Sequence, residues 1–260
     1  MVARIATYSG GTEATLADLQ AVPLPERTAT YTPIGHGDMC HTIHRVAADM
    51  LPDMEVDSTQ LVLAKEGARC FGITAYRPTG DVDSAGPMIA WRNSYDKSMS
   101  AALALGQQVS ACTNTQLSGE IFNAYVHTGS VIDRLKRDIV TYLYGARVVF
   151  DQLSQDNAAL SEVGVNEDAG FRFLGSLVGE KVLRPAEFNV ACREWRSPTH
   201  EEFEPRNAWS CYNAVTEGLK ATPMQSAMQT HVRFHDLART EWLPAAGATE
   251  AEFTEVATIN

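Results

Sequence analysis

The sequence predicts an α+β fold: an antiparallel sheet of four or more strands, packed by a long amphipathic helix and followed by a helical C-terminal half. Two observations favour this class. Between residues 60 and 129, short segments rich in β-branched and aromatic residues alternate with turn signals, which is typical of strands. From residue 130 onward, apolar residues instead recur at helical spacing. Strands and helices that segregate along the chain indicate an α+β architecture.

Four parts are expected along the chain: a flexible N-terminal arm (1–30), an α+β core (31–153), a helical C-terminal region (154–243) and a flexible tail (244–260). The arm is low in large aliphatic residues and contains Gly10-Gly11, Pro23 and Pro25. The first helix of the core is expected to begin with Asp38 as its N-cap and to end at Leu51, because apolar residues recur there at helical spacing.

The strands of the core follow this helix. The segments QLVLAKEGARCFGITAYRP and PMIAWRNSY are typical of antiparallel strands, with turns at Glu66-Gly67 and at TGDVDSAG. The segment SAALALGQQVSACTN fits either a helix or a strand, and we predict a strand that ends near Cys112. EIFNAYVHTG is typical of one more strand.

A long amphipathic helix is expected over residues 130–153, capped by Ser130. Its apolar residues fall on one side of a helical wheel, while the other side carries basic residues together with Thr141 and Tyr144. Further helices are expected around Ala169–Val178, Ala208–Leu219 and Met224–Trp242.

Charge is distributed unevenly. The formal net charge is −11, yet residues 61–150 hold 9 basic and 7 acidic residues, a net charge of +2, so the rest of the chain carries −13. This balance argues against a protein that grips duplex DNA over its whole surface. It is compatible with a local basic strip where the strands and the amphipathic helix lie.

Composition and cysteine spacing indicate the compartment. With 45% hydrophobic and 20% charged residues, the chain has the composition of a globular protein, and it contains no apolar run long enough to cross a membrane. The N-terminal residues lack the pattern of a signal peptide. Its five cysteines are odd in number and widely spaced, which is not typical of a disulfide framework. We therefore expect a cytoplasmic protein that has no membrane partner.

Polar residues end three of the expected strands, in WRNSYDKS, ACTNTQLSGE and YVHTG. By local pattern alone they are ordinary turn and capping residues. Their clustering beside aromatic side chains and a basic helix face favours a groove for single-stranded nucleic acid, which combines stacking surfaces with phosphate partners. The candidate nucleic-acid-binding residues are Arg92, Asn93, Tyr95, Lys97, Asn114, His127, Arg134, Arg137 and Arg147.

A resemblance to a known family rests on motif order. NSYDKS, a Gly-centred apolar run, C-x-N, SGE, V-H-x-G and a long helix occur in the same order in the phage- and plasmid-borne proteins called domain of unknown function 932. NAWSCYNAVTEGL resembles the C-terminal part of that family, so the likeness runs from about residue 31 to residue 242. The sequence departs from the pattern at Lys97 and Thr115. The resemblance implies a setting in mobile genetic elements and carries no reaction with it.

Metal and acid–base sites are the alternatives. His36, Cys40 and His44 lie at four-residue steps, but with Asp38 as the N-cap His36 would lie outside the helix, and we interpret the group as structural. His231 and His235 are one helical turn apart and are interpreted as part of a packed stripe. Asp96, Glu120 and His127 would form an acid–base or metal cluster only if their strand ends converge.

The leading hypothesis is a non-enzymatic protein of phage or plasmid DNA metabolism that binds single-stranded nucleic acid, forms a homo-oligomer and needs no cofactor. The succession of strands and a helix is also similar to the core of single-strand annealing proteins, a fold-level analogy. Two alternatives stay open. One is an acidic protein that binds and inhibits a host defence factor, and the other is a metal-dependent hydrolase or nuclease.

Overall fold

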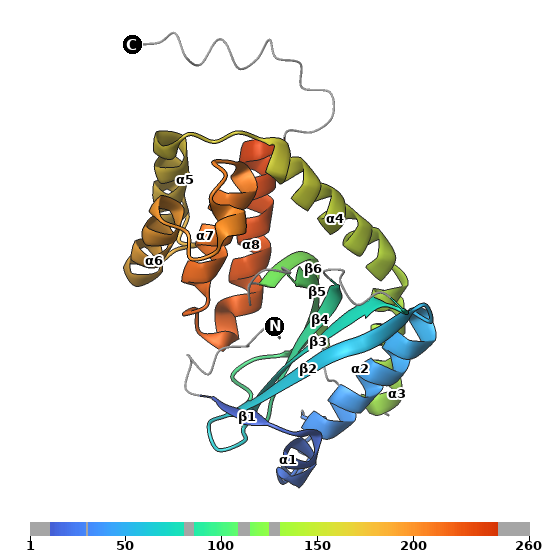
Figure 1. Cartoon of the computed structure of the whole chain (residues 1–260). Coiled ribbons are helices and arrows are strands. Elements are labelled where there is room, and N and C mark those ends of the chain that lie inside the picture. Colours follow the sequence, from blue (N-terminus) through green and yellow to red (C-terminus); the bar gives the residue numbers. More distant parts are fainter. Residues whose placement is uncertain (1–10, 30, 81–85, 109–114, 125–130, 244–260) are drawn as a thin grey trace.

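The computed structural model describes residues 11–29, 31–80, 86–108, 115–124 and 131–243 (Figure 1). Its strands are β1 (Thr12–Ala14), β2 (Met54–Ala64), β3 (Arg69–Pro78), β4 (Pro87–Ser94), β5 (Ala101–Gln108) and β6 (Thr115–Ala124). Its helices are α1 (Leu16–Ala21), α2 (His36–Met50), α3 (Val131–Tyr144), α4 (Ala146–Glu162), α5 (Glu167–Gly179), α6 (Pro185–Arg196), α7 (Ala208–Leu219) and α8 (Met224–Trp242), with a short 3₁₀ helix, η2 (Glu201–Phe203).

The six strands form one antiparallel sheet in the order of the sequence, β1-β2-β3-β4-β5-β6. The predicted α+β class and helical C-terminal half are confirmed. The predicted core strands are present, but β2 begins six residues and β6 five residues earlier than predicted, and the strand end predicted near Cys112 lies outside the described residues. A tight turn joins β2 and β3, and its central residues, Glu66 and Gly67, both have positive φ, of +57° and +87°. The predicted turn at Glu66-Gly67 is therefore present, with the left-handed backbone that two-residue hairpin turns require.

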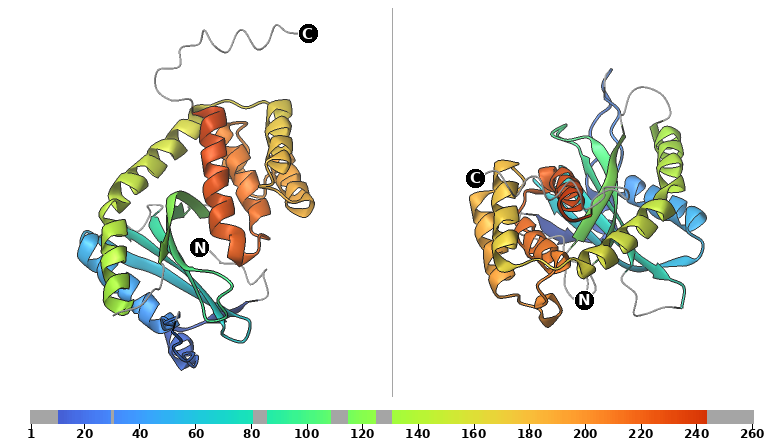
Figure 2. Two further views of the ribbon diagram at one scale, coloured as in Figure 1. Left: turned by 180° about the vertical axis from the view of Figure 1, so that it is seen from behind. Right: turned by 90° about the horizontal axis from the view of Figure 1, so that it is seen from above.

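Two hydrophobic clusters cover the two faces of the sheet. On one face, α2 and α3 pack against strands β2 to β5, and the apolar residues predicted for the long helix, among them Leu135, Ile139 and Leu143, are buried there. On the other face, Met228 of α8 packs against Met88 and its neighbours. A third cluster lies among the C-terminal helices, whose arrangement Figure 2 shows. The molecule thus has a sheet half and a helical half, with α4 running between them (Figure 1).

Close packing within the sheet explains why position 72 is a glycine. Gly72 of β3 pairs with Trp91 of β4, and the Trp91 indole lies over it. A Cβ at position 72 would come within 2.2 Å of the indole nitrogen, so only glycine fits beside the fully buried tryptophan.

Two helix boundaries differ from those predicted. α2 begins at His36 with Gly35 as its N-cap, so Asp38 lies in the first turn rather than before it. The expected single helix over 130–153 is two helices, separated at Gly145, and the second continues to Glu162 across the expected domain boundary. Gly145 has a weak helix preference, and the interruption lets α3 pack on α2 while α4 turns toward the helical half (Figure 2).

The N-terminal segment and α6 were also incompletely predicted. Residues 12–21, expected to belong to a flexible arm, form β1 and α1, and Leu19 of α1 is buried in the sheet-half core. A capping box between Thr15 and Asp18 begins α1. α6 begins with Pro185 at its first position and a buried Glu187, a start signal that the apolar spacing alone does not reveal. The expected tail, 244–260, lies outside the described residues.

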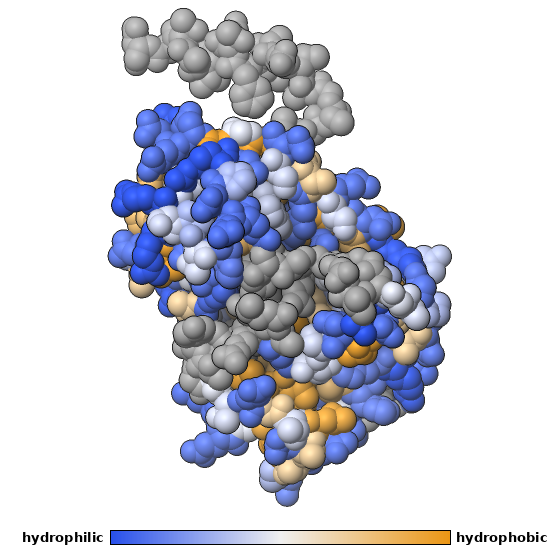
Figure 3. All heavy atoms as spheres, in the orientation of Figure 1, coloured by the Kyte–Doolittle hydropathy of each residue, from blue (hydrophilic) through white to orange (hydrophobic). Residues whose placement is uncertain are grey.

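On the face seen in Figure 3, hydrophilic residues cover most of the helical half. Within the residues that the structure describes, none of the helices has the length and apolar character needed to cross a bilayer.

Candidate nucleic-acid interface

The antiparallel order of the sheet decides which predicted strand ends meet. The β2–β3 turn, the end of β4 at Ser94 and the start of β5 at Ala101 lie at one end of the sheet, and Ala124 at the end of β6 pairs with Ala101 there. Gln108 and Thr115, which flank the segment containing Asn114, pair at the opposite end. The three polar strand ends therefore do not share one end of the sheet. Asn114 and His127 themselves lie outside the described residues.

Cationic and aromatic side chains gather at the first of these ends. We call this group the sheet-end cluster; its members are Tyr31, Lys65, Arg69, Tyr95 and Lys97. The ammonium group of Lys97 lies 4.7 Å from the ring centroid of Tyr31, whose hydroxyl donates a hydrogen bond to the carbonyl oxygen of Ser94. The backbone N–H of Tyr95 donates to the carbonyl oxygen of Ala68, at 2.7 Å, which ties the β2–β3 turn to the end of β4.

Charge within the sheet-end cluster is only partly neutralised. Arg69 forms an ion pair with Asp96, with 2.7 Å between Nε and Oδ2. Burial would raise the pKa of Asp96, but hydrogen bonds from Ser98 and Arg69 hold it below its ordinary value. No described carboxylate forms an ion pair with Lys65 or Lys97, and both side chains are exposed. These two cations are available to a phosphate group.

A buried histidine packs against the sheet-end cluster and holds it in place. The His36 and Tyr95 rings stack, with centroids 3.8 Å apart and planes 4° apart. His36 Nε2 lies 2.9 Å from the carbonyl oxygen of Gly67 and must therefore donate, so Nδ1 accepts from the Asn93 amide at 3.0 Å. Burial lowers the pKa of His36 to about 4, although the bond to Gly67 acts the other way. The ring is thus neutral and holds Tyr95 and the β2–β3 turn in place.

Arg92 and Asn93 are not on the exposed surface that the nucleic-acid hypothesis assumed. Each is 4% exposed, and as neighbours on β4 they point to opposite faces of the sheet. Arg92 Nη1 donates to the backbone oxygen of Gln225 and the side-chain oxygen of Gln229, both on α8. Asn93 donates to the carbonyl oxygen of Ile34 in addition to His36. Their polar groups serve internal contacts because α8 covers one face and α2 the other.

The three arginines of α3 and α4 are exposed, as predicted, but they differ in their partners. Arg147 forms a two-bond ion pair with Asp53 in the turn after α2, with 3.0 Å between Nη1 and Oδ2. Arg134 lies 3.9 Å from Asp138, one helical turn away. Arg137 has no ion-pair partner among the described residues.

The candidate metal ligands do not form a metal centre in the described part of the chain. No group of three or more His, Cys, Asp or Glu side chains is arranged there to hold an ion. His44 Nε2 lies 2.7 Å from the Thr74 hydroxyl and 4.0 Å from the Cys40 sulfur. Burial raises the pKa of the Cys40 thiol to about 11, so it is not a thiolate ligand or nucleophile at neutral pH.

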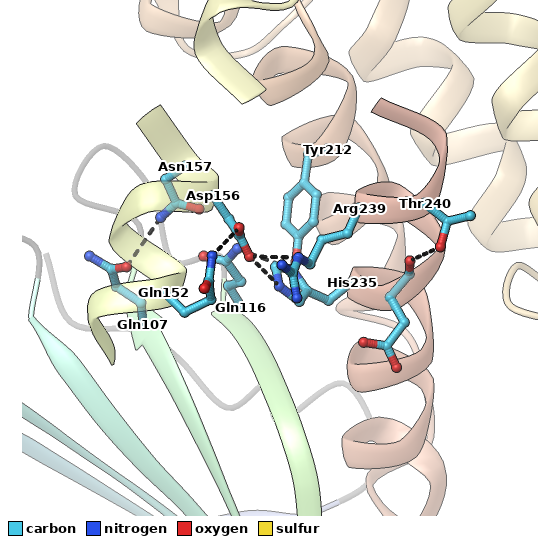
Figure 4. A network of polar contacts seen from close by, with 10 residues as sticks. Gln107, Gln116, Gln152, Asp156, Asn157, Tyr212, His235, Arg239 and Thr240 are labelled. Carbon is cyan, nitrogen blue, oxygen red and sulfur yellow. Dashed lines mark hydrogen bonds and ion pairs between the residues drawn. The ribbon is translucent and has the colours of Figure 1, made fainter. Parts of the chain in front are cut away.

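His235 belongs to a buried network that joins the two halves of the molecule (Figure 4). Its Nε2 lies 3.2 Å from Asp156 Oδ2, and its Nδ1 lies 3.2 Å from both the Tyr212 hydroxyl and the Gln116 amide. Arg239 lies 3.0 Å from the same Asp156 oxygen. Burial would raise the pKa of Asp156, but bonds from His235 and Gln152 and the charge of Arg239 lower it. The network connects β6, α4, α7 and α8.

Neither the family models, nor the curated proteins, nor the solved structures that were compared with this chain match it. The resemblance to domain of unknown function 932 therefore stays a prediction based on short motifs.

Three members of the sheet-end cluster, Tyr31, Lys65 and Arg69, were not among the predicted site residues. Lys65 and Arg69 flank the Glu66-Gly67 turn, and this position beside a hairpin turn is the sequence feature that could have indicated them as site residues. Tyr31 precedes α2, and only the tertiary fold brings it to the end of β4.

Proposed function

We propose that this protein binds single-stranded nucleic acid through the sheet-end cluster, in a non-enzymatic role in the DNA metabolism of a phage or plasmid. The observation that carries the proposal is the pairing of Lys97 with Tyr31: an exposed cation that has no carboxylate partner in the described part of the chain, held against an aromatic ring. Phosphate contact and base stacking are the two interactions that sites for single strands combine.

Backbone strain supports the same location. Four described residues other than glycine have positive φ, and three of them, Lys65, Glu66 and Lys97, lie at this end of the sheet. Each such residue costs about 1–2 kcal/mol, and strain of this kind concentrates at functional sites.

The bound single-stranded nucleic acid would continue from the sheet-end cluster onto α3. This helix begins seven residues after β6 ends beside the cluster, and its exposed Arg134 lies in its first turn. Arg147 lies outside this path because it is bound to Asp53 after the C-terminal end of α2. Arg92 and Asn93 serve the fold, and roles for Asn114 and His127 stay predictions.

Fluorescence anisotropy with labelled single-stranded and duplex oligonucleotides tests the proposal. We expect preference for the single strand, because stacking needs unpaired bases, and a loss of about 20-fold in affinity between about 50 and about 200 mM salt if three phosphates are neutralised. Lys97→Glu should weaken binding at least about 10-fold. Tyr31→Leu should weaken it by about 1–3 kcal/mol through lost stacking.

Lys181→Glu is the matched control. Lys181 is also exposed and also has positive φ, of +58° against +59° for Lys97, but it lies in the helical half. Absence of binding at the lower salt concentration, or an equal loss in both charge reversals, would contradict the proposal.

A further inference from the structure

An exposed apolar stripe runs over the bend between α3 and α4. We call it the elbow stripe; it consists of Val140, Tyr144 and Val148, at four-residue steps, with exposures of 36%, 83% and 73%. Gly145 has φ −88° and ψ −1°, so the backbone stays right-handed while its ψ departs from the helical value, and the chain bends there. All three side chains are exposed, whereas Ile139, Leu143 and Phe150 of the same two helices enter the core.

An ion pair joins the stripe to a neighbouring turn. Arg147, within the same turn as Tyr144 and Val148, is bound through both of its terminal nitrogens to Asp53. This ion pair attaches the elbow to the turn between α2 and β2. A contiguous exposed apolar surface is typical of a protein–protein contact.

Charges flank the stripe symmetrically. Arg137 lies seven residues before Tyr144 and Asp151 seven residues after it. Both are exposed, and neither forms an ion pair within the described residues. The order along the surface is therefore positive, apolar, aromatic, apolar, negative, with Arg147, which is bound to Asp53 and attracts Asp151, beside it.

We propose that the elbow stripe is the contact surface for a second copy of this chain. If two elbows pack antiparallel about a twofold axis at Tyr144, a residue n positions before it faces the residue n positions after it in the other copy. Val140 then meets Val148, and Arg137 meets Asp151, twice each. A pattern that is complementary to itself in this way is the requirement for an isologous dimer.

The same surface fits nucleic acid less well. Asp133, Asp138 and Asp151 lie on these helices and would repel phosphates, and two of the three members of the stripe are aliphatic and offer no ring for stacking. The contact is limited to about two helical turns on each side of Gly145. It is therefore smaller than a standard interface of about 1,600 Å², and we expect a dimer with a dissociation constant in the micromolar range or weaker.

Sedimentation equilibrium of the full chain, without nucleic acid, tests this. The wild type should pass from monomer to dimer as its concentration rises from about 1 μM to about 1 mM. Val148→Asp should weaken dimerisation by at least about 10-fold, because it buries a charge in the contact. Arg137→Asp and Asp151→Arg should each weaken it through like-charge pairs, and the double charge reversal should restore it.

A cysteine variant tests the register. A residue on the twofold axis meets its own counterpart, so Tyr144→Cys should form a disulfide-linked dimer under mild oxidation. Gln155→Cys is the control, because its two copies would lie about 30 Å apart. The wild type, which has native cysteines, is treated in parallel.

The proposal is overturned by a chain that stays monomeric throughout the concentration range, by charge reversals whose combination restores nothing, or by equal cross-linking of both cysteine variants. It is also overturned if Tyr144→Ser weakens oligonucleotide binding but does not change the monomer–dimer equilibrium in sedimentation. That result would assign the stripe to nucleic acid.

Discussion

Arg92 is buried between the sheet and α8, and no described carboxylate pairs with its guanidinium group. Its Nε has no hydrogen-bond partner among the residues that the structure describes, and burial lowers the pKa of the guanidinium group. Burying a charge without an opposite charge costs free energy that two hydrogen bonds to α8 only partly recover. The sequence places Arg92 five residues before Lys97 without indicating that one is covered and the other exposed.

We predict that Arg92→Met leaves the free energy of unfolding unchanged or raises it by about 1 kcal/mol, because methionine keeps most of the volume and removes the buried charge. Arg92→Ala should lower it by about 2 kcal/mol through the cavity it leaves. Urea titration measures both. Oligonucleotide affinity should be the same in Arg92→Met and the wild type; a clear loss would mean that Arg92 becomes accessible and contacts the ligand.

His36 should make stability depend on pH. Its folded-state pKa of about 4 lies below the ordinary value of 6.5, so the folded state favours the neutral ring. The contribution of His36 is fully present above pH 6.5 and is lost as the pH falls toward 4. The shift corresponds to about 3 kcal/mol.

We therefore expect the wild type to lose about 3 kcal/mol more than His36→Gln between about pH 7 and about pH 4, measured by denaturant unfolding at each pH. Glutamine keeps a donor for the carbonyl oxygen of Gly67. His44, whose pKa burial also lowers, is present in both proteins and cancels in the difference. Equal losses in the two proteins would show that His36 is free to become protonated in the fold.

At the scale of single elements, the β2–β3 turn contains one residue that favours its positive-φ backbone and one that does not. Gly67 suits its positive φ, but Glu66 occupies a position where Asn, Asp or Gly is preferred. We predict that Glu66→Asn raises the free energy of unfolding by about 0.5–1 kcal/mol, or the melting temperature by about 2 °C, in calorimetry. Glu66→Ala, which removes the charge without favouring positive φ, should bring no gain.

Gly67→Ala should lower stability instead, because a Cβ would add strain at φ +87° and contact Val22 at 3.0 Å. If Glu66→Asn also lowered stability, the glutamate would have a stabilising role that its exposed position does not show.

The elements that the sequence predicted well are those with a clear period. Alternating strand residues and the buried stripe of Leu135, Ile139 and Leu143 are direct consequences of burial on one side. Interruptions were harder to predict. Gly145 separates α3 from α4 because the two helices pack against different partners, which local spacing does not encode.

At the scale of the whole molecule, the candidate site depended on topology. Three polar strand ends close in sequence suggest one site, yet in a sheet whose neighbouring strands are antiparallel successive connections alternate between its two ends. The segment with Asn114 therefore joins strands at the end opposite to Tyr95 and Lys97. Tyr31, Lys65 and Arg69 reach the site through contacts across the fold, so only part of it could be predicted.

The network around Asp156 and His235 connects the sheet half to the helical half, beside the hydrophobic contacts that Met228 of α8 makes with the sheet. Removing the Asp156 carboxylate leaves buried His235 without its acceptor and Arg239 without its ion-pair partner. We predict that Asp156→Ala lowers the free energy of unfolding by about 3 kcal/mol and uncouples the halves.

Two probes can detect this uncoupling. In a Trp91→Phe background the remaining tryptophans, Trp195, Trp209 and Trp242, all lie in the helical half, so fluorescence reports that half while far-ultraviolet circular dichroism reports both. The two unfolding transitions should coincide with Asp156 present and separate in Asp156→Ala. Asp151→Ala, which removes an exposed carboxylate from the same helix, should leave them coincident. Transitions that stay together in Asp156→Ala would show that the α8 contacts with the sheet suffice to unfold the molecule as one unit.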